Sequence, residues 1–150
     1  MTGAPAILLV EDNPDDVLLI RRAFRRSGIT TPLSVVGDGD AAVAYLAGEG
    51  PYADRSLHPL PRLVLLDLKL PCRSGLEVLA WIRGRPAFSG LVVVVLTSSS
   101  ESRDLERAYA LGVNSFLVKP VEFDRLLDMV KTLDLYWLGL NEYPPRQEAP

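Results

Sequence analysis

The 150-residue sequence contains little of what marks several large classes of protein. Its single cysteine, Cys72, has no partner for an internal disulfide, which predicts a reducing, cytoplasmic environment. The longest apolar run, Leu91 to Leu96, is too short to span a bilayer, and residues 1–10 lack the cationic and apolar regions of a secretory signal. Lysine and arginine together number 16 against 19 for aspartate and glutamate, a net charge of −3. Broad nucleic-acid binding needs a concentrated cationic patch, so we expect neither nucleic-acid nor membrane partners.

What the sequence does contain is an alternation of short aliphatic runs and helix-like segments. Uninterrupted aliphatic runs of strand length are typical of parallel strands covered on both faces. We expect strands at residues 6–10, 33–36, 63–66, 91–96 and 115–118. We expect a first helix that begins at Pro14 and is closed by Gly28. Four more helices are expected at residues 40–47, 76–83, about 101–111 and about 122–135. Five strands, each followed by a helix, imply right-handed crossovers and a parallel sheet between helices.

The chain length and composition predict one domain. Hydrophobic residues make up 48% and charged residues 23%, both close to globular averages. The repeating units cover about residues 6–135, and a C-terminal extension, 136–150, follows them. A Pro-rich loop at residues 50–62 interrupts the alternation, and its role stays open.

Polar side chains follow four of the expected strands, at the point where each strand ends. They are Glu11 and Asp12, Asp67, Thr97, and Lys119. Ligands of parallel α/β sheets bind outside the carboxyl ends of the strands, so we expect these residues to meet at one edge. Any one of them could simply cap a helix or be solvated by water. Three carboxylates, a hydroxyl and an ammonium together are much harder to explain in that way.

The three acids would repel one another at neutral pH unless a cation lay among them. Carboxylate oxygens without thiolate or imidazole ligands suit Mg²⁺, which keeps several waters and so leaves room for a phosphoryl group. Lys119 would add a positive charge opposite the metal, and Thr97 a hydroxyl donor for a phosphoryl oxygen. A carboxylate in this setting can act as a nucleophile and form an aspartyl phosphate.

The order and spacing of these residues resemble the receiver domain of the two-component response regulators. The matching segments are Leu9-Val10-Glu11-Asp12-Asn13, Leu65-Leu66-Asp67-Leu68 with Pro71 and Gly75, Val95-Leu96-Thr97-Ser98, and Phe116-Leu117-Val118-Lys119-Pro120. The resemblance covers about residues 6–135. It implies a single α/β domain with the flavodoxin-like (βα)5 fold, a parallel sheet of strand order 2-1-3-4-5.

The resemblance also implies the metal-binding and phosphoacceptor residues. Asp67 becomes the phosphoacceptor, and Glu11 and Asp12 become the acids that bind Mg²⁺ together with it. Lys69 stands two positions after Asp67, where receivers frequently have a small polar residue. Its backbone carbonyl can still bind the metal, because the side chain does not alter that group.

A switch mechanism is implied by the same resemblance. Thr97 becomes the switch hydroxyl, Phe116 the switch aromatic and Lys119 the lysine that pairs with the phosphoryl group. Pro120 would follow a cis peptide bond, as in that family. From the residues alone, Phe116 could equally be a core aromatic on a buried strand.

A narrower resemblance points to small stand-alone regulators that work with bacterial phytochrome kinases. It rests on the 50–62 loop, the Asn13-Pro14-Asp15-Asp16 helix start and the Tyr136-Trp137 pair. It implies phosphoryl transfer from a separate, light-regulated sensor histidine kinase, since the only histidine, His58, is badly placed to act as a phosphodonor. Surplus apolar residues near the chain end suggest a protein contact. We expect a homodimer through the fourth helix, fifth strand and fifth helix, reinforced by residues 136–150.

Three alternatives remain to the expected signalling domain, which would catalyse only its own phosphorylation and dephosphorylation and is not a turnover enzyme. The first is a Mg²⁺-dependent phosphohydrolase with an aspartyl intermediate, although enzymes resembling the haloacid dehalogenases place an acid where Lys69 stands. A flavodoxin-type flavin carrier would need a Ser/Thr/Gly-rich phosphate loop where Glu11 and Asp12 stand. A pseudo-receiver that signals without phosphate is disfavoured, because the set of site residues is complete.

Overall fold

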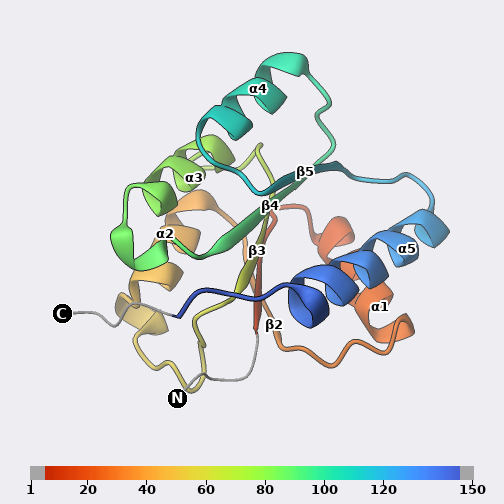
Figure 1. Ribbon diagram of the computed structural model, residues 1–150, viewed down its shortest axis with the longest axis horizontal. Coiled ribbons are helices and arrows are strands. Elements are labelled where there is room, and N and C mark those ends of the chain that lie inside the picture. Colours follow the sequence, from red (N-terminus) through yellow and green to blue (C-terminus); the bar gives the residue numbers. More distant parts are fainter. Residues whose placement is uncertain (1–5, 146–150) are drawn as a thin grey trace.

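The computed structural model describes residues 6–145, in which five strands form one parallel sheet with helices on both faces (Figure 1). The strands are β1 (Ile7–Val10), β2 (Leu33–Val36), β3 (Leu63–Leu66), β4 (Val92–Thr97) and β5 (Ser115–Val118). The helices between and after them are α1 (Pro14–Arg26), α2 (Gly39–Ala47), α3 (Gly75–Arg83), α4 (Ser102–Ala110) and α5 (Phe123–Leu133). The strand order is β2-β1-β3-β4-β5, which confirms the predicted flavodoxin-like fold.

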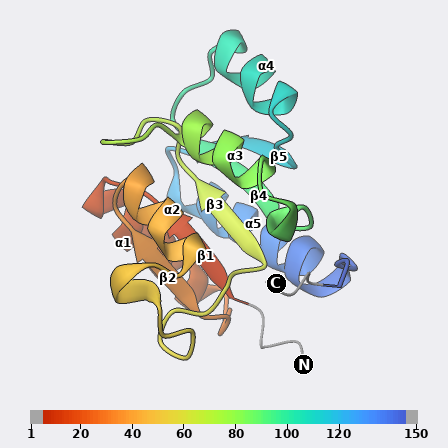
Figure 2. The same cartoon turned by 90° about the vertical axis from the view of Figure 1, so that its left-hand side faces the viewer.

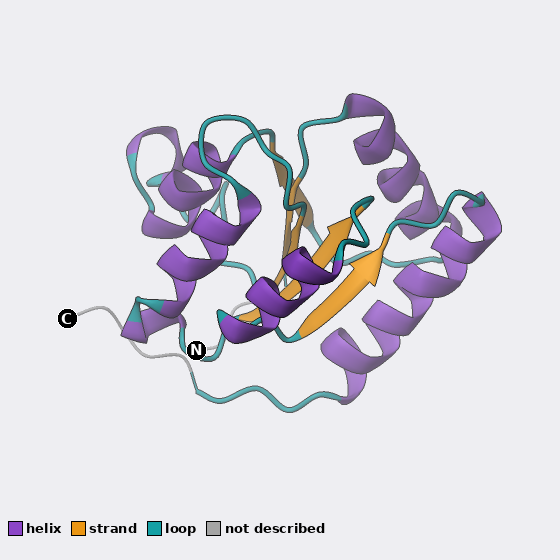
Figure 3. Ribbon diagram, turned by 90° about the horizontal axis from the view of Figure 1, so that it is seen from above, coloured by secondary structure: helices purple, strands orange, loops and turns teal. Residues whose placement is uncertain are grey.

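Two hydrophobic layers hold the helices to the sheet, because successive side chains of a strand point to opposite faces. Leu8 and Val10 contribute to the layer beneath α2, α3 and α4, and Ile7 and Leu9 to the layer beneath α1 and α5. Figure 2 views the face that α2 and α3 cover, and Figure 3 shows the strands with helices on either side of them. Among the described residues no helix is both long and apolar enough to cross a membrane.

Helix α1 begins close to the carboxyl edge of the sheet, as its sequence predicted. The Asn13 side chain accepts a hydrogen bond from the Asp15 N–H at 2.9 Å, and Pro14 occupies the first helical position. After the helix ends at Arg26, Gly28 adopts a φ of +71°, a conformation that favours glycine. Only three residues separate β1 from α1, so the first turn of α1 lies beside the ends of the neighbouring strands.

The 50–62 loop is held against the end of α2 by Arg55. Its guanidinium donates to the Tyr45 and Leu46 carbonyls at 2.7 and 2.8 Å, and to the His58 carbonyl at 3.2 Å. The His58 ring packs edge-on against Tyr45 and Tyr52, with ring centroids 5.7 and 5.2 Å apart. The loop therefore supplies donors to carbonyls in the last turn of α2, where the intrahelical N–H partners run out.

The helical backbone after α5 runs further than the sequence predicted. The helix was expected to end near residue 135, but a π-helical segment, η3 (Asp134–Leu140), continues α5. Trp137 and Leu138 pack against the layer beneath α1 and α5, and the Tyr143 hydroxyl donates to the Trp137 carbonyl at 2.6 Å. The described part of the extension therefore packs on the domain, while residues 146–150 lie outside the described residues.

Candidate functional site

The register of the sheet places the predicted polar residues side by side at its carboxyl edge. Val10 is paired with the last residue of β3, so Glu11 and Asp67 leave the sheet together. The Asp67 N–H donates to the Val10 carbonyl at 3.1 Å and extends this pairing beyond the strands. The Lys119 N–H donates to the Thr97 carbonyl at 2.8 Å, and this bond extends the pairing of β4 and β5 beyond the end of β5.

Three carboxylates meet at this edge. Glu11, Asp12 and Asp67 each offer an oxygen, and these oxygens all lie within 4.8 Å of one another. Glu11 and Asp67 are buried, whereas Asp12 is exposed, so the cluster opens to solvent on one side. A donor set of carboxylate oxygens with one open side fits a hard divalent cation such as Mg²⁺ or Mn²⁺.

The Lys119 ammonium lies against this cluster and is paired with three acids. Its Nζ lies 2.9 Å from Asp67 Oδ2, 2.8 Å from Asp16 Oδ2, and in contact with a Glu11 oxygen. Burial disfavours the ammonium, but its hydrogen bonds to Asp16, Glu11 and Asp67 prevail and raise the pKa of Lys119 above its usual value. Lys119 is therefore a fixed positive charge beside Asp67.

Glu11 is the acid whose protonation the surroundings alter most clearly. Burial raises the pKa of Glu11 from 4.5 to about 6, against hydrogen bonds from Lys119 and the Asn13 N–H that favour the carboxylate. The negative charge of Asp67 also raises it. A cation bound among these acids would relieve that repulsion.

Thr97 ends β4 and Phe116 lies in β5, and their switch roles stay predictions. Thr97 is completely buried, and its hydroxyl oxygen accepts the Ser99 N–H at 3.3 Å. The Ser99 hydroxyl donates to Asp104 of α4 at 2.8 Å, which ties this loop to the helix. Phe116 is half-buried and packs against the layer beneath α2, α3 and α4, so its interpretation as a core aromatic also stays open.

The loops that carry Lys69 and Pro120 border the acid cluster; metal binding by the Lys69 carbonyl stays a prediction, whereas the expectation for Pro120 is contradicted. The Lys69 N–H donates to Asp67 Oδ1 at 3.3 Å, so this loop wraps around the carboxylate, while the Lys69 side chain is exposed. The expected cis peptide bond before Pro120 is wrong, because no peptide bond among the described residues is cis. The trans form is intrinsically favoured by about 0.5–1 kcal/mol in X–Pro bonds, and here Lys119 reaches the acids with the trans bond in place.

Sequence reasoning missed Asp16, which it interpreted only as an acid in the first turn of a helix. The structure places its carboxylate on the Lys119 ammonium, 103 positions away in the sequence. The sequence did contain a signal for this position. Asp16 follows Asp12 by four residues and lies in the first turn of the helix, from which a side chain can face the edge of the sheet.

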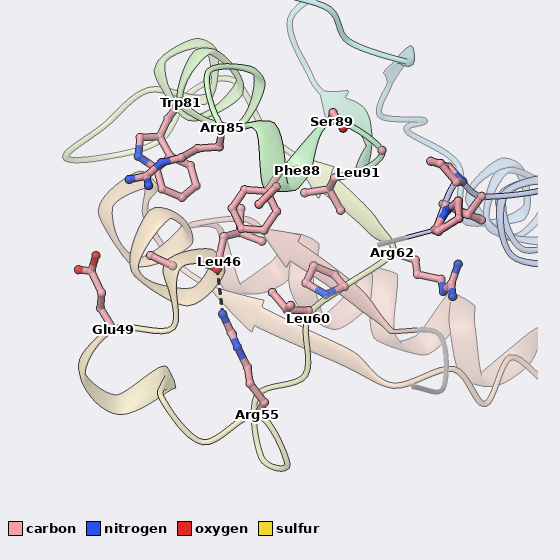
Figure 4. A pocket seen from close by; sticks show the side chains of 17 residues that line it. Leu46, Glu49, Arg55, Leu60, Arg62, Trp81, Arg85, Phe88, Ser89 and Leu91 are labelled. Atoms are coloured by element: carbon pink, nitrogen blue, oxygen red, sulfur yellow. Dashed lines mark hydrogen bonds between the residues drawn. The ribbon is translucent and has the colours of Figure 1, made fainter. Parts of the chain in front are cut away.

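A separate cavity of about 600 Å³ lies at the opposite edge of the sheet (Figure 4). Its walls come from the ends of α2 and α3, the segments that precede β3 and β4, and the described tail. Trp81 and Phe88 line it, and Arg55 beside it donates to the Leu46 carbonyl. None of the polar residues at the carboxyl edge contributes to this cavity.

Most of the chain matches one known protein family. The response regulator receiver domain family matches residues 7–131. The chain belongs to this family. The predicted resemblance to receiver domains is thereby confirmed, and with it the assignment to two-component signalling.

Individual relatives of this receiver domain cover almost its whole length. A probable methanogenesis regulatory protein, FilR2 of Methanothrix harundinacea, is 48% identical over 92% of this chain and 86% of its own. The phosphorylated cyanobacterial phytochrome response regulator RcpA has a structure with a TM-score of 0.87 at 38% identity, covering 95% of this chain and all of its own. The structure of the Mn²⁺-bound response regulator Rcp1, from Synechocystis, has a TM-score of 0.83 at 38% identity. The match covers 94% of this chain and 99% of the Rcp1 chain. The structural similarity to RcpA confirms the predicted resemblance to phytochrome response regulators.

Proposed function

We propose that this receiver domain accepts a phosphoryl group on Asp67 from the phosphohistidine of a sensor kinase. The observation that carries the proposal is the geometry around Asp67. Its carboxylate lies within 4.8 Å of the Glu11 and Asp12 oxygens, and one of its own oxygens is 2.9 Å from the Lys119 ammonium. In this proposal residues 6–135 form the receiver core and 136–150 an extension.

A divalent cation, which we propose is Mg²⁺, fits the all-oxygen cluster. Glu11, Asp12 and Asp67 would hold it, together with the Lys69 backbone carbonyl. When bound, it supplies positive charge that offsets the charge on phosphoryl oxygens. The Mn²⁺-bound form of Rcp1 supports a divalent site in a relative.

The residues of the chain itself perform the remaining chemistry. An Asp67 oxygen forms a bond to phosphorus while the phosphorus–nitrogen bond of the phosphohistidine breaks, and its electron pair returns to the imidazole nitrogen. Lys119, already beside Asp67, pairs with a phosphoryl oxygen, and Thr97 donates its hydroxyl to another. The same domain later loses the phosphoryl group to water. We propose that it catalyses only its own phosphorylation and dephosphorylation and is not a turnover enzyme.

The signal would leave the site through the face formed by α4, β5 and α5. Lys119 follows β5 directly and Thr97 ends β4, so movement of either side chain acts on this face. Phe116 of β5 would move inward as Thr97 shifts toward the phosphoryl group. We propose that the face forms a homodimer, because it exposes apolar side chains. These are Leu105, Tyr109, Val118, Val121 and Leu135.

The proposed partner is a phytochrome-type sensor histidine kinase of the cytoplasm. The similarity to RcpA, a phytochrome response regulator, supports this partner. FilR2, which is more similar in sequence at 48% identity against 38% for RcpA, is a probable methanogenesis regulatory protein and gives no such support. Incubation with a radiolabelled, autophosphorylated bacteriophytochrome kinase tests the pairing directly. Transfer of label to wild type but not to Asp67→Asn within minutes supports it, and transfer only from kinases of another class contradicts it.

The phosphoacceptor role itself is tested by intact-mass analysis after incubation with Mg²⁺ and acetyl phosphate. We expect wild type to gain the mass of one phosphoryl group, and Asp67→Asn or a chelator-treated sample to gain none. The matched control is Asp54→Asn, because Asp54 is an exposed acid of the 50–62 loop, outside the cluster. Phosphorylation that persists in Asp67→Asn would contradict the proposal.

The same incubation separates the signalling domain from the alternative phosphohydrolase. With small phosphomonoesters in place of acetyl phosphate, a phosphohydrolase would release phosphate steadily over many turnovers. A receiver domain would release none beyond what its own dephosphorylation yields. The exposed Lys69, two residues after Asp67, stands where the phosphohydrolase would need an acid, which favours the receiver.

A further inference from the structure

A fourth carboxylate, that of Asp16, takes part in the site although nothing in the motif of the family assigns it a role there. Asp16 belongs to the first turn of α1, and its Oδ2 lies 2.8 Å from Lys119 Nζ. Its side chain is 31% exposed, whereas that of Lys119 is 14% exposed. The pair therefore links the first turn of α1 to the end of β5 at a partly exposed position.

Helix capping does not account for the position of this side chain. An acid in the third helical position often accepts the N–H of the N-cap residue. Here that N–H, of Asn13, donates instead to Glu11 Oε2 at 3.1 Å. The Asn13 side chain takes the Asp15 N–H. Within the described part of the chain, the hydrogen bond of Asp16 goes to Lys119.

The ammonium of Lys119 has three N–H groups and three carboxylates around it. Two of these, Glu11 and Asp67, also belong to the cluster proposed to bind a divalent cation, whereas Asp16 does not. The ammonium and the cation thus compete for the same two acids. We propose that Asp16 is a positioning residue, which draws the Lys119 ammonium toward α1 and leaves Glu11 and Asp67 available to the cation.

The direction of the effect follows from two electrostatic arguments that agree. Without the Asp16 charge, the ammonium would pair more strongly with Glu11 and Asp67 and oppose cation binding. The site would also lose a negative charge close to the cluster, which weakens attraction for any cation. Removal of the Asp16 charge should therefore weaken divalent binding, although Asp16 is not a ligand. This inference rests on the proposed function, because it assumes that the cluster binds a divalent ion.

Mn²⁺ is a suitable probe, since the electron paramagnetic resonance signal of free Mn²⁺ reports binding without any phosphorylation. We expect Asp16→Asn to raise the dissociation constant about threefold to fivefold, the range for a partly exposed charge pair. Asp15→Asn is the matched control: the same helix turn loses the same charge, but Asp15 is exposed and makes no ion pair among the described residues. Its effect should stay below about twofold because exposed charges are screened. Asp16→Glu restores the charge and should restore the affinity.

A double-mutant cycle with Lys119→Met tests whether Asp16 acts through Lys119. In that background, Asp16→Asn should weaken Mn²⁺ binding less than it does in the wild-type background, because only the direct loss of a negative charge remains. Equal affinities for Asp16→Asn and Asp15→Asn in the wild-type background would overturn the inference, as would an undiminished effect without Lys119. If circular dichroism shows that Asp16→Asn fails to fold, Asp16→Ser takes its place. Wild type that binds no Mn²⁺ would instead overturn the proposed function.

Discussion

In each buried acid of the site, one carboxylate oxygen contacts the Lys119 ammonium and the other accepts a hydrogen bond from a backbone N–H. Asp67 presents Oδ2 to Lys119 at 2.9 Å and Oδ1 to the Lys69 N–H at 3.3 Å. Glu11 presents one oxygen to Lys119 and Oε2 to the Asn13 N–H at 3.1 Å. For Glu11 these bonds favour the carboxylate, yet burial prevails and raises its pKa. Both acids are therefore held in fixed orientations by groups that the short loops supply.

The raised pKa of Glu11 predicts a pH dependence of stability in metal-free protein. A pKa of 4.5 in the unfolded chain and about 6 in the folded protein means that the folded state binds the proton more tightly. The resulting stability is present below pH 4.5 and is lost as the pH rises through 6, a loss of about 2 kcal/mol. Urea unfolding with a chelator present should show this loss in wild type but not in Glu11→Gln.

The control for this pH dependence is Glu106→Gln, because Glu106 is an exposed acid of α4. It should follow the wild-type curve at every pH. The difference in unfolding free energy between Glu11→Gln and wild type should grow by about 2 kcal/mol between pH 4.5 and pH 7. A difference that stays constant over this range contradicts the assignment of the effect to Glu11.

At this scale the sequence predicted which residues meet, but not how they pair. Parallel strands bring their carboxyl ends to one edge, which was enough to place Glu11, Asp67 and Lys119 together. The contact of Asp16 with Lys119 depends on the rotation of α1 about its own axis and on two side-chain rotamers. Local sequence patterns do not reveal those angles, which depend on the packing of the whole fold, so this contact could be recognised only in the structure.

At the scale of elements, Gly75 lets α3 begin directly against the loop that carries Asp67. Its N–H donates to the Leu68 carbonyl at 2.9 Å. A Cβ on Gly75 would lie 2.2 Å from the Asp67 carbonyl oxygen and 2.6 Å from Leu68 Cα, both backbone atoms. We expect Gly75→Ala to lower the free energy of unfolding by about 1–3 kcal/mol, the usual cost of overpacking, in urea titrations.

The control for Gly75→Ala is Gly37→Ala, because a Cβ on Gly37 would meet no atom within 4 Å and its φ is not positive. That substitution should change the free energy of unfolding by less than about 0.5 kcal/mol. Since the Gly75 clash involves the Asp67 backbone, Gly75→Ala should also slow phosphorylation by acetyl phosphate. Equal stabilities of the two variants would contradict the close-approach argument.

Element boundaries were predicted well where the sequence carries an explicit stop signal. Gly48, which follows α2, has a φ of +71°, as a helix-ending glycine commonly does. After α5 no glycine or proline intervenes before Gly139, and apolar residues continue, so the local pattern could not fix the end of the helix. The packing of the 50–62 loop could not be predicted from the sequence either, because the hydrogen bonds of Arg55 to carbonyls of α2 form only in the folded chain.

At the scale of the whole molecule, the acid cluster and the proposed dimer face are joined by β5. Lys119 directly follows β5 and contacts Asp67. Val118, the last residue of β5, is exposed on the proposed dimer face. The loop after β4 leads from Thr97 to α4, where Ser99 is hydrogen-bonded to Asp104. A phosphoryl group that attracts Thr97 and Lys119 would therefore pull on both edges of the α4-β5-α5 face. The cavity of Figure 4 lies at the other edge of the sheet, away from this route.

The proposed homodimer gives a prediction that involves this entire face. Tyr109 of α4 is 52% exposed and Leu135, after α5, is 62% exposed, and burial of either against a second copy would favour association. We expect sedimentation equilibrium to show a reversible wild-type dimer at micromolar concentration, strengthened by Mg²⁺ and acetyl phosphate. Tyr109→Asp and Leu135→Asp should each weaken it about tenfold or more. Leu57→Asp is the control, because Leu57 is 71% exposed but lies in the 50–62 loop, outside this face. A monomeric wild type in both phosphorylation states, or equal weakening by Leu57→Asp, would rule out this face as the dimer interface.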